Sequence, residues 1–228
     1  MASPTSGIHG FPEMIKKNAV RHFFVPITVG TMLAIFASIR FLDRQLALAV
    51  MGFLKASRFL HTATANIPDI LFLFVCVSTS AMWLDYFYLS RHKGRADQLR
   101  LLQLGANAVP AAYLVKEVLQ FVFGRTNTRA WLVTGAPDQV NWFHGGGVGG
   151  FPSGHMTVFT AFAVAFCSVY PCYRRLAVLG LAVLGAALII TDYHFLSDVI
   201  AGAYVGLLVT HTILYSLQRF GFRLWLTR

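Results

Sequence analysis

Six apolar stretches, each long enough to cross a lipid bilayer, constrain the fold of this chain more than any other feature. They run over Phe23–Ile39, Ile67–Ser90, Leu99–Phe123, Ser153–Tyr170, Leu176–Tyr193 and Asp198–Leu217. About 20 apolar residues suffice to span a bilayer as a helix. Only 12% of the residues are charged, against about 25% in an average soluble protein. We therefore expect an all-α, polytopic membrane protein built as a six-transmembrane-helix bundle.

The ends of the chain and the link between the first two stretches are expected to lie outside the spans. Residues 44–68 carry Arg44, Lys55 and Arg58 within apolar sequence, a pattern that predicts an additional interfacial helix. Residues 1–21 lack an apolar core of the kind found in a cleaved signal peptide. We expect residues 1–21 to form a cytoplasmic segment, 22–218 a six-helix membrane domain, and 219–228 a cytoplasmic tail.

The distribution of Lys and Arg predicts the orientation. Twice as many of them lie on the side that holds both termini as on the opposite side, so both termini are expected in the cytoplasm. Arginine-rich cytoplasmic turns and the compact build favour a bacterial inner membrane. The net charge of +10 comes largely from span ends, where cations meet anionic headgroups. Membrane lipids, and no nucleic acid, are therefore expected as partners, while the oligomeric state stays open.

Three polar clusters are expected at the outer end of the bundle, at the ends and beginnings of its spans. They cover Lys116–Arg129, His144–His155 and Asp192–Asp198. Ionisable groups are costly in a membrane, so these clusters are candidate functional residues. The cysteines are odd in number, and Cys76 and Cys167 lie within spans. They predict neither a disulfide framework nor a metal site.

The sequence Pro152-Ser153-Gly154-His155 has the features of a helix start that binds an anion. Pro152 favours the first helical turn and Ser153 is a good capping residue. The first backbone N–H groups of a helix lack internal partners and attract anions, and Gly154 would let a tetrahedral anion approach them. A capped helix start with an incidental histidine is the alternative.

His194 and Asp198 are four residues apart, so on a helix they would share one face. A carboxylate that accepts from the Nδ1–H of a histidine leaves Nε2 unprotonated, which suits a nucleophile or a base. Arg125 and Arg129 lie on the side poorer in positive charge and could bind a dianionic phosphoryl group. Alternatively, His194 and Asp198 could form a purely structural hydrogen bond, and the two arginines could simply anchor the end of a span at the membrane.

These residues together resemble a known family. "PSGH", followed about forty residues later by "HFLSDVIAG", is similar to the type 2 phosphatidic acid phosphatase superfamily, with which vanadium haloperoxidases and bacterial acid phosphatases share an active site. The family pattern joins a Lys, six residues and Arg-Pro to Pro-Ser-Gly-His, and then to Ser-Arg, five residues, His, three residues and Asp. The second part is intact, and His194 and Asp198 match the third.

The cationic positions of the pattern are changed in this sequence. Gln120 stands at the family Lys position, Asn127 at the first Arg position, and Leu188 at the second. Lys116, one helical turn before Gln120, could supply the missing ammonium group. Arg129 fits the first Arg position if the loop carries a two-residue insertion.

The resemblance implies a metal-independent lipid phosphatase without a cofactor, whose substrate is a lipid phosphate. In this scheme His194 attacks phosphorus to give a phosphohistidine, and His155 protonates the leaving oxygen and then activates water. Asp198 orients His194. The phosphate oxygens are expected to be held by Ser153, Gly154, Arg125, Arg129 and Lys116. The site is expected at the outer, periplasmic face.

Four alternatives stay open at this point. His144, His155, Asp192, His194 and Asp198 could surround a zinc ion, although no usual ligand spacing is present. The stretch "HGGG" and Ser153 suggest a serine esterase, but the G-x-S-x-G pattern is missing. The protein could also be a lipid phosphotransferase, or a non-catalytic lipid-phosphate binding or transport protein of the same fold. His144, beside Gly145–Gly150, could belong to a lid over the substrate.

Overall fold

The computed structural model describes residues 17–54, 67–134, 142–143 and 149–219, which are almost entirely helical. The helices are α1 (Lys17–Ala37), α2 (Asp43–Leu54), α4 (Ile67–Arg91), α5 (Ala96–Phe123), α6 (Thr128–Thr134), α7 (Gly154–Val169), α8 (Arg174–Ile190) and α9 (Leu196–Arg219). A π-helical turn, Ser38–Leu42, joins α1 to α2, and a 3-10 turn, Pro171–Tyr173, precedes α8. Each of the six expected apolar stretches corresponds to one of these helices, namely α1, α4, α5, α7, α8 and α9.

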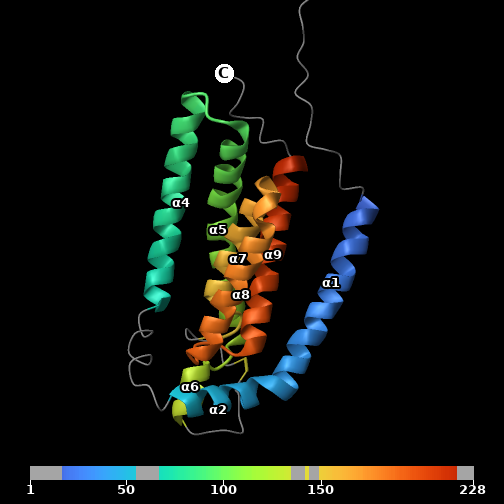
Figure 1. Ribbon diagram of the computed structural model, residues 1–228, viewed down its shortest axis with the longest axis vertical. Coiled ribbons are helices and arrows are strands. Elements are labelled where there is room, and N and C mark those ends of the chain that lie inside the picture. The colour runs from blue at the N-terminus through green and yellow to red at the C-terminus, as the bar shows by residue number, and fades with distance from the viewer. Residues whose placement is uncertain (1–16, 55–66, 135–141, 144–148, 220–228) are drawn as a thin grey trace, which may run out of the picture.

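The bundle is built around α7. This helix packs mainly against α9 and α5, and α5 packs also against α4, while α1 lies against α9. In Figure 1, α4 stands on one side of this group and α1 leans against the other. Glycines allow the close approach of α7 and α9, because a Cβ at Gly202 would lie 2.6 Å from the Ser153 carbonyl oxygen. At Gly206 the same atom would lie 2.3 Å from the Thr157 carbonyl oxygen.

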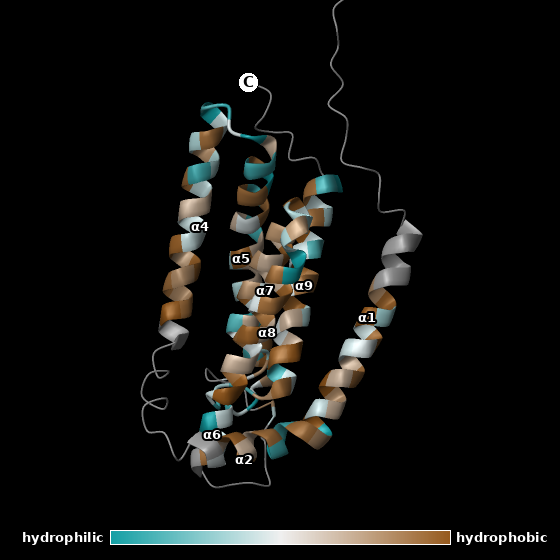
Figure 2. Cartoon of the chain, in the orientation of Figure 1, coloured by the Kyte–Doolittle hydropathy of each residue, from teal (hydrophilic) through white to brown (hydrophobic). Residues whose placement is uncertain are grey.

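The outer surface of the bundle is apolar. Large exposed side chains include Leu33 and Phe36 on α1, Leu73 on α4, and Leu176 and Val183 on α8. Figure 2 shows this hydrophobic colour along the sides of the helices. A surface of this kind is unstable in water, and it matches the hydrocarbon core of a membrane. The protein is therefore a multi-pass membrane protein.

Four helices of the described part are long and apolar enough to cross a membrane. They are Phe24–Gly52, which continues from α1 into α2, and Ile70–Arg91, Pro171–Ile190 and Leu196–Arg219. The two remaining long helices, α5 and α7, pack against each other inside the bundle, and α5 also exposes Leu114, Val118 and Phe121. Helix α7 has only 16 residues, and α5 is 28 residues long and contains Lys116 and Glu117. The count of six spans stays a prediction.

The segment that was expected to be interfacial forms α2 over part of its length. In Figure 1, α2 turns away from α1 and runs across the end of the bundle where α6 lies. Residues 55–66 are outside the described part, as are residues 1–16 and 220–228. Placement of α2 at a membrane interface, and the proposed boundaries of the membrane domain, therefore stay predictions.

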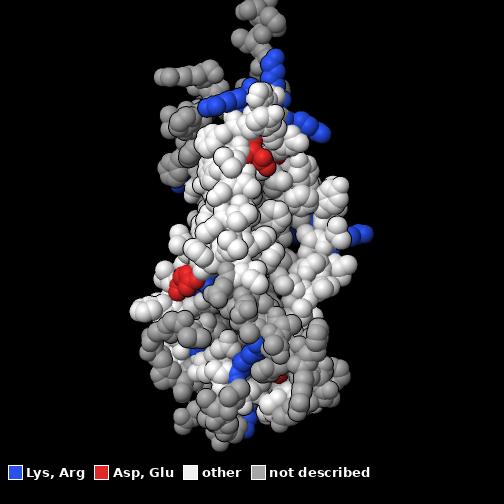
Figure 3. Space-filling view, turned by 90° about the vertical axis from the view of Figure 1, so that its left-hand side faces the viewer, with Lys and Arg blue, Asp and Glu red and all other residues white. Residues whose placement is uncertain are grey.

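The two ends of the bundle differ in charge and in the elements they contain. Helix α1 begins and α9 ends at the same end as the turn between α4 and α5 (Figure 1). That turn exposes Arg91, Lys93 and Arg95, and Figure 3 shows Lys and Arg side chains gathered there above a broad surface nearly free of charge. The opposite end holds α2, α6 and the beginnings of α7 and α9.

Candidate active site

The start of α7 has the capped geometry that its sequence predicts. Ser153 is the N-cap, with extended backbone angles (φ −61°, ψ 120°), and its Oγ accepts from the Met156 N–H at 3.5 Å. This satisfies one of the N–H groups that lack a partner at a helix start. Pro152, however, precedes the cap, so the expectation that it lies in the first helical turn was wrong. The side chain of Ser153 is fully buried.

Gly154 lies under the side chain of Lys116. A Cβ at this position would be 3.2 Å from Cδ of Lys116 and 3.3 Å from Cδ2 of Leu71. These contacts are tighter than most Cβ atoms make, so an alanine here would require the side chain of Lys116 or Leu71 to shift by a few tenths of an ångström. With glycine at residue 154, the Lys116 stem lies directly over the first turn of α7.

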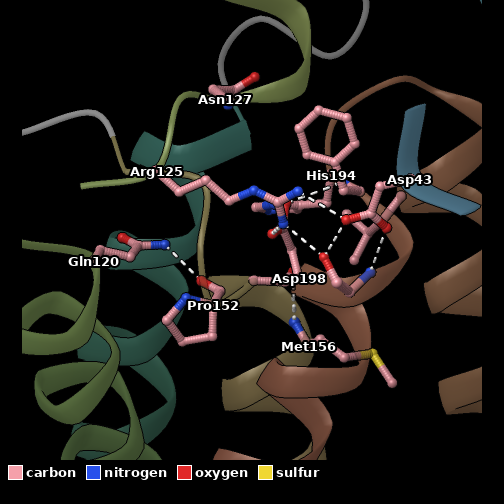
Figure 4. Close-up of polar contacts among 12 residues, drawn as sticks. Asp43, Gln120, Arg125, Asn127, Pro152, Met156, His194 and Asp198 are labelled. Carbon is pink, nitrogen blue, oxygen red and sulfur yellow. Dashed lines mark hydrogen bonds and ion pairs between the residues drawn. The ribbon is translucent and has the colours of Figure 1, made fainter. Parts of the chain in front are cut away.

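Lys116 and Gln120 connect α5 to this helix start. The ammonium group of Lys116 donates to Oε1 of Gln120 at 3.2 Å and pairs with the Glu117 carboxylate at 2.7 Å. Gln120 in turn donates from Nε2 to the Pro152 carbonyl at 2.8 Å (Figure 4). Lys116 is 8% exposed. The glutamine at the family Lys position thus contacts the backbone beside Ser153, and a lysine lies directly behind it.

His194 lies in the turn before α9, because the helix begins only at Leu196. The expected arrangement of His194 and Asp198 on one helical face was therefore wrong in detail, although the two side chains do meet. Nδ1 of His194 is 3.6 Å from Oδ2 of Asp198, which is longer than a hydrogen bond. Oδ2 accepts instead from the Phe195 N–H at 3.0 Å. Asp198 thus caps its own helix while facing the imidazole.

Tyr193 lies beside both histidines. Its ring centroid is 5.8 Å from that of His155 and 5.0 Å from that of His194, edge-on in both cases. The guanidinium carbon of Arg129 lies 5.6 Å from the same ring. His155, His194 and Arg129, which are far apart in the sequence, therefore come together at one end of the bundle around a single phenol ring.

Arg129 is half-buried and reaches the turn that precedes α9. Its Nη2 donates to the Thr191 carbonyl at 3.2 Å. Its backbone N–H donates to Oδ1 of Asn127 at 2.9 Å, so Asn127 caps α6, and its side chain points away from Arg125 in Figure 4. The asparagine at the family Arg position thus has a structural contact, while Arg129 lies closer to the histidines.

Arg125 lies deeper in the protein than the other candidate cations. It is 1% exposed, and its guanidinium group donates to Asp198 at 2.5 Å, to Ser197 at 2.6 Å and to Asp43 at 2.7 Å (Figure 4). From the sequence, this arginine was expected to bind the substrate phosphate. In the structure, its nearest anionic partners are two carboxylates of the protein itself.

Three residues of this region were missed by sequence reasoning: Asp43, Tyr193 and Ser197. Asp43 begins α2 and is 3% exposed. A carboxylate within apolar sequence indicates that a partner is needed when it is buried, but the sequence does not show where that partner lies. Ser197 donates two hydrogen bonds to the Asp43 carboxylate, from its backbone N–H to Oδ1 and from its hydroxyl to Oδ2.

Asp192 and His144 were named from the sequence as possible zinc ligands, and His144 also as part of a possible lid. Asp192 is 5% exposed in the turn after α8, and burial raises the pKa of its carboxyl to about 6, while nearby Arg129 opposes the rise. His144 lies outside the described residues, so its role stays open. Within the described residues, no group of three or more His, Cys, Asp or Glu side chains is close enough together to hold a metal ion.

The chain is similar to one family of known proteins and to one solved structure. A crystal structure of the first transmembrane PAP2-type phosphatidylglycerolphosphate phosphatase from Bacillus subtilis is similar, with 18% sequence identity and a TM-score of 0.47. The similarity covers 86% of this chain and 98% of that chain. A search of curated proteins found no match. The family model of the PAP2 superfamily matches residues 102–222, which include both histidines and all the candidate cations. Because this match covers more than half of the sequence, the chain belongs to the PAP2 superfamily.

Proposed function

We propose that the protein is an integral-membrane phosphatase that hydrolyses a phosphomonoester or pyrophosphate of a lipid. The observation that carries this proposal is that three parts of the chain meet at one end of an apolar bundle: the start of α7, the turn before α9 and the first turn of α9. The capped start of α7 supplies backbone N–H groups, while His155 and His194 both contact Tyr193. Asp198 lies behind His194. Two imidazoles beside the start of a helix are the arrangement that a phosphohistidine mechanism requires.

The proposed reaction has two displacement steps at phosphorus. Nε2 of His194 attacks phosphorus and forms an N–P bond as the bond to the leaving oxygen breaks, and His155 donates a proton to that oxygen. His155 then takes a proton from water, whose oxygen attacks phosphorus and releases His194 and inorganic phosphate. Asp198 stabilises the charge that develops on His194 during the first step.

The phosphate oxygens carry the charge that must be stabilised in both steps. We assign their binding to Ser153, the Gly154 N–H, Lys116 and Arg129. Positioning and charge stabilisation provide most of the catalysis in phosphoryl transfer. No resident metal is part of this scheme, and Lys116 and Arg129 provide positive charge that the residues at positions 120, 127 and 188 do not.

The proposed location is the inner membrane of a bacterium, with both termini in the cytoplasm and the site at the periplasmic face. The support is the cluster of Arg91, Lys93 and Arg95 at the end of the bundle opposite the site, since cytoplasmic loops are richer in Lys and Arg. A single cysteine introduced at residue 93 and tested with a membrane-impermeant thiol reagent checks this, in a chain whose own cysteines are replaced by serine. Labelling in intact cells would contradict the orientation.

The function is tested by phosphate release from purified protein in detergent. The substrates are phosphatidate, phosphatidylglycerophosphate, a polyprenyl pyrophosphate and a lipid A phosphate, each with and without a metal chelator. We expect release from at least one of them, unaffected by the chelator. His194→Asn should abolish release and retain binding of inorganic phosphate. Release by the His194→Asn variant at the wild-type rate would reject the assignment of the nucleophile.

The same experiment separates two alternative functions. The loss of family cations at Gln120, Asn127 and Leu188 favours a protein that binds a lipid phosphate without turning it over. That protein would bind inorganic phosphate yet release none from any of the four lipids. A phosphotransferase would instead release little phosphate until a second lipid or a sugar with a free hydroxyl is added as acceptor.

A further inference from the structure

A buried cluster of four side chains lies directly behind the proposed nucleophile. We call Asp43, Arg125, Ser197 and Asp198 the buried arginine cluster, and each of its members is at most 3% exposed. Arg125 follows α5, Asp43 begins α2, and Ser197 and Asp198 lie in the first turn of α9. The cluster therefore joins three separate parts of the chain at the end of the bundle that holds His194 (Figure 4).

Arg125 bridges the two carboxylates of the cluster. Its Nη1 donates to Oδ1 of Asp198 at 2.5 Å, and its Nη2 donates to Oδ2 of Asp43 at 2.7 Å. Nη1 also donates to the Ser197 hydroxyl at 2.6 Å. The guanidinium carbon lies 4.3 Å from the ring centre of Phe195 and 4.7 Å from that of Trp142. Aromatic contacts and two carboxylates thus fix the guanidinium group in place.

The charge of this cluster argues against a second anion at Arg125. One guanidinium and two carboxylates carry a net charge of −1, within residues that solvent barely reaches. A buried charge must be compensated by its neighbours, and here the only cation of the cluster is already shared by two anions. The Nε–H of Arg125 has no hydrogen-bond partner within the described residues. A phosphate dianion that approached this Nε–H would enter a region of net negative charge.

The contacts of Asp198 indicate that Arg125 fixes the orientation of this carboxylate. Oδ1 is held by Arg125, while Oδ2 accepts from the Phe195 N–H at 3.0 Å and faces Nδ1 of His194 at 3.6 Å. Because each oxygen is fixed by a different donor, the carboxylate cannot rotate away from the imidazole. Asp43 completes the arrangement from α2 by holding Arg125 and the backbone N–H of Ser197, at 3.0 Å.

We propose that Arg125 and Asp43 are positioning residues that hold Asp198 against His194, and that Arg125 does not bind the substrate phosphate. This inference rests on the proposed function of His194 and Asp198. It assigns a role to α2, which lies outside the matched family region, residues 102–222. The planar fork of arginine is needed because a lysine ammonium group is a point charge and cannot hold two carboxylates in fixed directions.

Two conservative variants and one control test this proposal. Arg125→Lys keeps the charge but loses the fork, and Asp43→Asn leaves a neutral Arg125–Asp198 pair that should fold even if Arg125→Lys does not. Arg44→Lys changes the neighbouring, exposed arginine of α2 and serves as control. Two kinds of measurement are made in detergent for each purified variant: kcat and KM for the one of the four lipids that the wild type hydrolyses fastest, and the rise in Tm that inorganic phosphate produces.

For both cluster variants we expect kcat to fall about 10–100-fold, by analogy with residues that orient the histidine and carboxylate ligands of metal sites. KM should change less than about threefold, and the phosphate-induced rise in Tm should be retained, because the phosphate site is intact. The double variant Asp43→Asn/Arg125→Lys should lose no more activity than the worse single variant, since both act through Asp198. The control should match the wild type.

The results that would overturn the proposal differ from those that would overturn the function. Loss of the phosphate-induced rise in Tm in Arg125→Lys, with KM raised tenfold or more, would place Arg125 on the phosphate. An unchanged kcat in Asp43→Asn would also reject the positioning role. If the wild type is stabilised by phosphate but releases none from any lipid, the proposed function fails, and the rise in Tm of Arg125→Lys alone then decides the role of Arg125. A wild type that shows neither effect rejects both.

Discussion

Replacing Gly202 by alanine should separate the two helices that carry the proposed site. The added Cβ would lie 2.6 Å from the Ser153 carbonyl oxygen and 3.0 Å from Cβ of Met156, whereas ordinary contacts begin at 3.4 Å. Backbone atoms cannot swing aside, so α7 and α9 must move apart by about 0.8 Å, and overpacking of this kind costs about 1–3 kcal/mol. For a chain of this size we expect Tm in detergent to fall by about 2–12 °C.

The matched control is Gly180→Ala on α8. A Cβ at Gly180 meets no atom within 4 Å, so only the higher helix propensity of alanine counts, and it should stabilise the protein by about 0.5–1 kcal/mol. The same substitution should therefore lower Tm at residue 202 and raise it slightly at residue 180. Phosphate release should fall only for Gly202→Ala, because that change displaces Ser153. Equal Tm values for Gly202→Ala and the wild type would refute the reasoning.

Three further predictions concern single side chains. Ser153→Ala removes a cap whose hydrogen bond is long, at 3.5 Å, so unfolding in detergent should show a loss of about 0.5–1 kcal/mol. Lys116→Met keeps the stem that packs on Gly154 and removes the charge, so steady-state kinetics should show KM raised about tenfold or more; an unchanged KM would exclude Lys116 from phosphate binding. Asp192 has a pKa of about 6, above its ordinary 3.8, so the native state binds its proton more tightly than the unfolded state does, and stability should fall as pH rises from about 4 to about 6. Asp192→Asn, which tolerates the left-handed backbone at this residue (φ 51°), should remove this dependence and give up to about 3 kcal/mol of extra stability at pH 7, measured by thermal unfolding across that range.

The helices of the bundle could be predicted from the sequence because a membrane requires long apolar segments. The stretch Ile67–Ser90 corresponds to α4, which ends one residue later. The boundary of α9 was less accurate, since Asp198 was expected to begin a span that starts at Leu196. An aspartate in the first turn of a helix can also be taken for its first residue, so the sequence alone does not locate the start of the helix.

The meeting of the candidate residues was predictable only in part. The start of α7 follows from local rules, because Ser153 is a preferred cap. The surroundings of Arg125 could not be predicted, since they depend on Asp43, which is 82 residues away and reaches Arg125 only because α2 turns across the end of the bundle. Tyr193 was missed for a similar reason: its contact with His155 joins two helix ends that only the packing of α7 against α9 brings together.

The close approach of α7 and α9 at Gly202 and Gly206 has a consequence for how a lipid could enter. Ser153, His155 and His194 are each at most 8% exposed, so little of their surface is open to an approaching headgroup. At Gly202 and Gly206 the backbones of α7 and α9 already lie against each other, with no room for a side chain between them. A lipid phosphate is therefore not expected to enter the site between α7 and α9.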